Sequence, residues 1–337
     1  MERPTPCLDG LPDELIHKII DNIDAFERRP LRLCSHDFKY FVDNTTTNYS
    51  RIIIEITDQM VDITLISGKF NNVLMLVYNQ FEHSGQISVN GNPPIYYDGG
   101  WPDQHFNLAI SDLFQFLSKP KVFVKRLELR VSVREYATVC KFMEKFRRKF
   151  AENPWYFCVR TFHARTVLKQ TEMMSIVSQF EPGYLEDLDV WYCCLRDEGD
   201  EFLNSPQWMH AKRAKVVGRV PRDKIWHFRK FDGGGSMTLD EVQVLIDTTI
   251  SNASTFEFFQ MDVVSANQEI IDLLEKYQVF EPTDKLFPQE KLLKILDDGS
   301  KILISYVYSF RESDNAENKL RISKIAADGE RVSWWFF

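Results

Sequence analysis

The segment from Leu11 to Val42 constrains the fold most, because it holds more apolar surface than a short helical pair can bury. Pro12 is placed to begin a helix, and the acidic Asp13 and Glu14 follow in its first turn. Apolar residues recur along this helix at helical spacing: Leu11, Leu15, Ile16, Ile19, Ile20 and Ile23. A second helix is expected to begin near Pro30 and carries another apolar set: Leu31, Leu33, Cys34, Phe38 and Phe41. A unit of about 35 residues cannot bury this surface alone, so it needs the rest of the chain or another protein.

This segment resembles an F-box. The family opens with Leu-Pro-x-Glu-Leu, which is here Leu11-Pro12-Asp13-Glu14-Leu15, and it closes on a stretch similar to LRLCSHDFKYFV at residues 31–42. The resemblance implies that the helices dock into a groove of the Skp-family adaptor of an SCF-type ubiquitin ligase. The residues expected to contact the adaptor are Leu11, Pro12, Leu15, Ile19, Ile20, Ile23, Leu31 and Phe38.

Four positions depart from the family pattern. Cys34 and Ser35 stand where the family usually has Val and Cys, and Arg28 and Arg29 stand where apolar residues are common. The two arginines would weaken the adaptor surface if they lay on it. The alternative to docking is an ordinary amphipathic helical hairpin that packs on its own domain.

Composition limits the possible classes of protein. The 337 residues suffice for two or three folded units, and 44% hydrophobic residues describe a globular chain. The net charge of −8 argues against a general nucleic-acid binder. Six cysteines at positions 7, 34, 140, 158, 193 and 194 form no zinc-binding spacing. With no apolar leader and no run long enough to span a membrane, the chain is expected in the cytoplasm or nucleus.

Downstream of residue 120, strand and helix patterns alternate. The stretch 124–131 alternates apolar and charged residues, 136–150 has helical spacing, and 185–192 alternates again. Further expected elements are a helix at 172–180 and strands at 157–165, 211–217, 226–231, 255–261 and 302–308. Repeated strand–helix units favour parallel strands, so the predicted fold class is α/β, an N-terminal helical F-box followed by an irregular, leucine-rich-repeat-like curved sheet.

Three stretches in this region resemble the FTH domain, which follows the F-box in a large nematode protein family. They are EPGYLEDLDV at 181–190, SPQWMHAKRAKV at 205–216 and IWHFRKFDGGGSMTLDEVQVL at 225–245. Their order predicts four regions: an F-box at 1–48, a connecting region at 49–119, an FTH domain at 120–265 and a C-terminal segment at 266–337. Trp208, within the second motif, is expected in the core.

The sequence contains little that indicates an enzyme. The seven histidines form no metal-binding motif, so no catalytic residue, metal ligand or cofactor is predicted. The run Gly233–Ser236 has the glycines of a phosphate loop but lacks its lysine, and a flexible turn leading into a helix capped by Thr238 and Glu241 is the simpler interpretation. Ligand binding at this run stays as an alternative.

Two basic stretches need interpretation. Residues 141–150 carry cations opposite aromatics, which is typical of a surface helix and favours neither a membrane nor a nucleic-acid role. Residues 211–224 hold six cations, which fit either a solvated strand edge or a contact with an acidic partner.

The sequence therefore predicts a non-catalytic substrate receptor, tethered through the adaptor to a cullin scaffold and holding a target protein. On the polar face of the sheet, Trp191 is the expected anchor for the target, flanked by Arg130, Asp189 and Lys215. The alternative is a protein that sequesters or neutralises one partner without degrading it.

Overall fold

The computed structural model describes residues 11–81, 84–98, 103–118, 121–132, 136–151, 156–192, 201–218, 220–251, 256–263, 269, 272–273, 290–296, 299–309 and 317–327. The chain forms two compact units. The first holds residues 1–166 and 171–185, and the second holds residues 167–170 and 186–337.

The first unit begins with three short helices, α1 (Asp13–Asp21), α2 (Arg28–Cys34) and α3 (His36–Asn44). Pro12 precedes α1 at the N-cap, with Asp13 and Glu14 in the first turn, as the sequence predicts. The expectation of one helix after Pro30 is wrong, because the helical conformation is interrupted at Ser35, between α2 and α3. The backbone there is extended, and the Ser35 hydroxyl accepts a hydrogen bond from the Phe38 amide at 3.1 Å, which caps α3.

A sheet of order β7-β6-β1-β2-β3-β4-β5 follows in the first unit. Its first part is an antiparallel meander: β1 (Thr47–Thr57), β2 (Met60–Ser67), β3 (Val73–Gln80), β4 (Ser84–Val89) and β5 (Ile95–Asp98). The loop 90–94 joins β4 to β5, and its first two residues, Asn90 and Gly91, have positive φ angles of 50° and 72°, the backbone that a tight turn requires.

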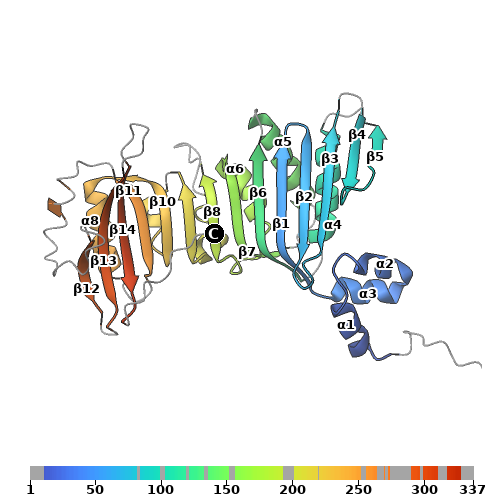
Figure 1. Ribbon diagram of the computed structural model, residues 1–337, viewed down its shortest axis with the longest axis horizontal. Coiled ribbons are helices and arrows are strands. Elements are labelled where there is room, and N and C mark those ends of the chain that lie inside the picture. The colour runs from blue at the N-terminus through green and yellow to red at the C-terminus, as the bar shows by residue number, and fades with distance from the viewer. Residues whose placement is uncertain are drawn as a thin grey trace, which may run out of the picture. The chain divides into compact units, whose positions relative to one another are not determined.

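Helical crossovers build the parallel part of this sheet. Helix α4 (Gln104–Leu117) leads to β6 (Val122–Ser132), which pairs parallel with β1. Helix α5 (Tyr136–Ala151) then leads to β7 (Cys158–Leu168), parallel to β6, and α6 (Gln170–Val177) follows. Figure 1 shows α4 and α5 against one face of these strands. The side chains that alternate inward are fully buried there, among them Ile54, Ile63 and Leu129.

The second unit has the sheet order β12-β13-β14-β11-β10-β9-β8. The parallel strands are β8 (Asp187–Tyr192), β9 (Arg213–Val217), β10 (Lys230–Met237) and β11 (Phe258–Val263). Helix α7 (Pro206–His210), the 3-10 turn η2 (Arg222–Lys224) and α8 (Leu239–Ser251) connect them. The antiparallel strands are β12 (Glu290–Ile295), β13 (Lys301–Ser309) and β14 (Glu317–Ile325). Trp208 on α7 is fully buried, which confirms its predicted place in the core.

The fold is mixed α/β, and the expected alternation of strand and helix is found from β6 to β11. The antiparallel meander β1–β5 and the antiparallel strands β12–β14 differ from the expected repeat, because hairpins rather than helices join them. Likeness to leucine-rich repeats therefore stays a prediction. Strand β1 pairs with β6 in the first unit and β11 pairs with β14 in the second, and the region boundaries at 120 and 265 stay a prediction.

Candidate protein-docking surfaces

The helices α1–α3 have a small apolar core of their own. Ile16 and Ile20 on α1 pack with Phe41 and Val42 on α3, and all four side chains are buried. Leu11, Leu31 and Phe38 are half-buried around them. Ile20, expected to contact the adaptor, is only 1% exposed. In this structure it packs in the small core between α1 and α3 and does not reach the surface.

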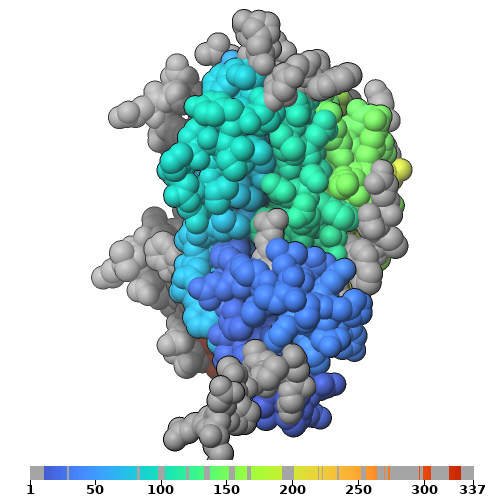
Figure 2. Space-filling view, turned by 90° about the vertical axis from the view of Figure 1, so that its right-hand side faces the viewer, coloured from blue at the N-terminus to red at the C-terminus, as the bar shows by residue number. Residues whose placement is uncertain are grey.

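A stripe of α1 next to this core is apolar and exposed. Leu15 and Ile19, one helical turn apart, are 45% and 40% exposed, and Pro12 is exposed at the start of the helix. Ile23, Leu31 and Phe38 are intermediate. Leu33 on α2, at 78% exposed, was omitted from the predicted contact set although it lies in the same apolar pattern. Figure 2 shows the blue atoms of these helices open to view.

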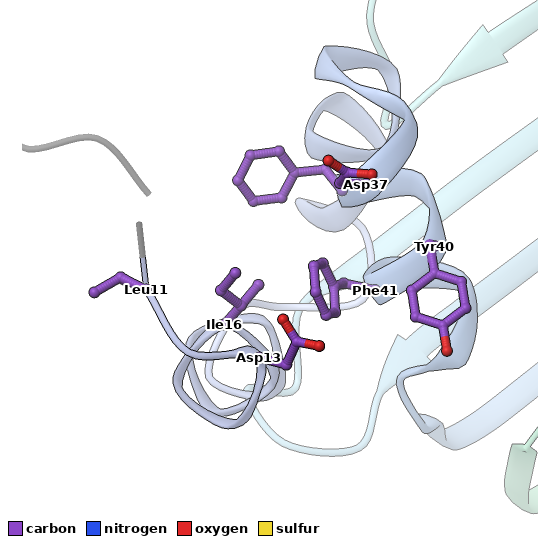
Figure 3. A pocket seen from close by; sticks show the side chains of 7 residues that line it. Leu11, Asp13, Ile16, Asp37, Tyr40 and Phe41 are labelled. Carbon is purple, nitrogen blue, oxygen red and sulfur yellow. The ribbon is translucent and has the colours of Figure 1, made fainter. Parts of the chain in front are cut away.

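A groove of about 320 Å³ lies between α1 and α3. Ile16 and Phe41 lie next to each other at its base, and the Asp13 carboxylate lies beside them (Figure 3). Asp37 and Tyr40 also line it, so the groove combines an apolar floor with two exposed carboxylates.

Arg28 anchors these helices to the sheet. Its guanidinium donates hydrogen bonds to the carbonyls of Ile23 at 3.0 Å and Thr46 at 2.9 Å, and the side chain is buried. Burial lowers the pKa of Arg28, although the nearby carboxylates of Asp21 and Asp24 counteract this effect. Arg28 therefore points inward and does not disturb the exposed face of α1. The side chain of Arg29 is outside the described residues.

The Arg28→Met variant should lower the free energy of unfolding by about 2 kcal/mol, because it leaves the Ile23 and Thr46 carbonyls without their donor while it keeps most of the volume. Denaturant unfolding measures this loss. Arg32→Met is the matched control, since Arg32 pairs with Asp43 at a half-exposed position, and its loss should stay below about 1 kcal/mol. Equal losses in both variants would contradict the anchoring role.

On the second unit, β8 and β9 present the expected target-binding residues on one face. Trp191 is 43% exposed, whereas its neighbours in the chain, Val190 and Leu188, alternate into the core. Asp189 is the cross-strand partner of Lys215, and Trp191 is the partner of Val217, which is 53% exposed. The structure thus brings Asp189, Trp191 and Lys215 together, with an apolar neighbour that sequence reasoning missed.

A polar row continues from Lys215 across this face. Asp232 on β10 lies beside Lys215 and accepts a hydrogen bond from the Gln260 amide at 3.1 Å, and Arg321 on β14 donates to Gln260 at 2.9 Å. Burial raises the pKa of Asp232, although the positive charge of Lys215 counteracts this effect. The row supplies fixed donors and charges next to the exposed Trp191 and Val217.

Arg130, the fourth expected residue, belongs to the first unit. Its guanidinium donates to the Glu128 carboxylate at 2.8 Å, and Arg51 and Arg126 also pair with Glu128, at 2.6 and 2.7 Å. The Glu128 side chain is only 2% exposed, so the three arginines cover it. Arg130 therefore has a structural role within this cluster, and the structure does not group it with Trp191.

Two other sequence features receive a structural explanation. The run Gly233–Gly235 lies inside β10 and is not the expected flexible turn. A Cβ atom at Gly233 would lie 1.9 Å from the Val216 carbonyl oxygen, so glycine is required by the close approach of β9. Thr238 and Glu241 form the predicted capping box of α8.

Part of the basic stretch 211–224 is paired within the chain. Lys212 pairs with Glu186, and Arg213 pairs with Asp187. Arg219 and the side chain of Arg222 lie outside the described residues. Within the described part of the chain, no group of histidine, cysteine or acidic residues is suited to a metal ion, and no helix is long and apolar enough to cross a membrane.

The sequence matches two protein-family models, one over the N-terminal helices and one over part of the strand–helix region that follows. Residues 8–48 match the F-box domain, and residues 140–283 match the FTH domain. The chain carries an F-box and an FTH domain. F-box proteins are generally non-catalytic subunits that bind Skp-type adaptors, and the domain suggests an SCF substrate-adaptor role in general. The FTH match covers a later stretch than the expected 120–265. Among curated proteins, none matches this sequence.

Proposed function

We propose that this protein is the substrate-recognition subunit of an SCF-type ubiquitin ligase. Its F-box binds a Skp-family adaptor and, through it, a cullin scaffold, while its second unit holds a target protein. The chain breaks no bond itself, and it raises the effective concentration of target lysines near the ubiquitin-transfer machinery. The proposed place of action is the cytoplasm or nucleus.

The observation that carries this proposal is the exposure of Leu15 and Ile19 on a helix whose neighbouring stripe, Ile16 and Ile20, is already packed. If α1 were only an amphipathic helix of its own domain, a single apolar stripe would suffice, and it would be buried. Instead Ile16 and Ile20 fill the internal core, while Leu15 and Ile19 remain 45% and 40% exposed. A second apolar stripe that stays substantially exposed suits a helix that packs against another protein.

Co-purification of the full chain with a Skp-family adaptor tests the proposal. Stoichiometric capture that persists through size-exclusion chromatography is the expected result. A folded chain that captures no adaptor would contradict the ligase role and leave the sequestering function, which partner half-life with and without proteasome inhibition distinguishes.

The proposed anchor for the target is Trp191, with Val217 beside it and Asp189 and Lys215 at its edge. Trp191→Ala should remove the partners that the wild type captures, with an affinity loss of at least tenfold, because exposed tryptophans in a polar setting often dominate binding. Quantitative affinity purification compares wild type, Trp191→Ala and the control Tyr96→Ala, which removes a 70% exposed aromatic from β5. Partners unchanged by Trp191→Ala, or lost equally with Tyr96→Ala, would overturn this assignment.

A further inference from the structure

A basic groove lies between helices α4 and α5 in the first unit. Its cavity volume is about 380 Å³, and its lining residues are Asn107, Ile110, Ser111, Lys145, Arg148 and Lys149. Helix α4 supplies a neutral polar wall, and α5 supplies the three cations. Among the residues that the structure describes, no acidic side chain lines the groove, although the whole chain has a net charge of −8.

All three cations of the groove contact other side chains of the chain, but these contacts leave the charges of Lys145 and Lys149 unneutralised. The Lys145 ammonium donates to the Asn107 side-chain oxygen at 2.9 Å, and the Lys149 ammonium lies 5.2 Å from the centre of the Phe114 ring. Among the described residues, no carboxylate forms an ion pair with Lys145 or Lys149. Arg148 pairs with Glu144, one turn earlier on the exposed side of α5. The positive charge over the groove is therefore available to a ligand.

We propose that this groove binds an extended acidic segment of a partner protein. Lys145 and Lys149 are one turn apart, which places them about 6 Å from each other along the helix axis. Carboxylates at alternate positions of an extended peptide are spaced by roughly 6.8 Å, which is close to the axial spacing of the two lysines on α5. Ile110 at the base is only 2% exposed, so charge and hydrogen bonds supply the recognition.

The groove differs from the F-box and from the Trp191 surface, so the proposal goes beyond the proposed function and its failure leaves that function intact. Basic residues 141–150 alone are the usual surface of a solvated helix. The structure adds the facing wall of α4, with Asn107 and Ser111 positioned as hydrogen-bonding groups.

Fluorescence anisotropy of the full chain with a labelled peptide, acidic at alternate positions, tests the proposal. The peptide should bind at low salt, and a counterpart with Asn and Gln in place of Asp and Glu should not. The Lys145→Gln/Lys149→Gln double variant should weaken binding about five- to tenfold, as expected for two exposed ion pairs. Added salt should weaken binding further.

Arg147→Gln is the matched control, because Arg147 is exposed on the same helix but does not line the groove. Its effect should stay below about twofold if recognition is local. Several outcomes would overturn the proposal: no peptide binding, equal binding of the neutral peptide, or equal loss with Arg147→Gln. A single-stranded oligonucleotide that binds more tightly, with the same dependence on Lys145 and Lys149, would assign the groove to nucleic acid instead.

Discussion

The Leu15→Asp and Ile19→Asp variants should each abolish capture of a Skp-family adaptor. Both side chains are exposed in the chain alone, so an aspartate at either position stays solvated and leaves the fold intact. In the complex the same carboxylate would lie in a dry apolar interface, where an unpaired charge costs several kcal/mol. We therefore expect at least about a hundredfold loss of affinity. Co-purification and calorimetric titration with the isolated adaptor measure it.

Two further variants separate loss of binding from loss of folding. Lys18→Asp places the same charge at an exposed α1 position outside the apolar pattern and should leave capture unchanged. Ile20→Asp introduces the charge into the small core with Ile16 and Phe41, so it should unfold the F-box and lose capture together with helical structure. If Leu15→Asp and Ile19→Asp remained folded and still bound the adaptor, this face would not be the docking surface.

Helical periodicity in the sequence locates α1 but not the orientation of its apolar residues. Residues 15, 16, 19 and 20 are all aliphatic, so two adjacent stripes exist, and only the packing of Phe41 and Val42 decides that Ile16 and Ile20 face inward. Ser35 was noted as a departure from the family pattern, but its effect, a helix break with its own cap, depends on backbone angles that the residue type does not dictate.

Contacts in the sheet are harder to predict from the sequence than the helix α1, because they join residues that are far apart in the chain. The alternation in β8 correctly places Trp191 outside and Val190 inside, because period-two patterns act over a few residues. Glu128, in contrast, was read only as one charge on the polar side of a strand. Its partner Arg51 lies 77 residues away on β1, and only the parallel pairing of β1 with β6 brings the two together. The groove between α4 and α5 likewise depends on tertiary packing that local patterns do not encode.

The Glu128→Gln variant should destabilise the first unit by about 2–3 kcal/mol at neutral pH, somewhat less than the roughly 3–5 kcal/mol typical of breaking a buried ion pair. Glutamine keeps the shape but removes the charge that three guanidinium groups share. Arg51, Arg126 and Arg130 are about a third exposed, so solvent screens part of their mutual repulsion, which is why the expected loss is not larger. Glu144→Gln is the control, because it removes the same charge from an exposed pair on α5 and should cost less than about 1 kcal/mol.

The pH dependence of the free energy of unfolding tests whether the charge of Glu128 causes this stabilisation. Burial alone would raise the pKa of Glu128, but the hydrogen bond from Arg130 and the charges of Arg126 and Arg51 together lower it below the ordinary value of a glutamate. A carboxyl with a lowered folded-state pKa stabilises the fold above its unfolded-state pKa and loses that contribution as the pH falls through the folded-state value. The difference between wild type and Glu128→Gln should therefore be constant near neutral pH and shrink below about pH 4.5. Denaturant unfolding across this range measures it, and a difference that does not change with pH would mean that Glu128 stabilises the sheet through shape and not through its charge.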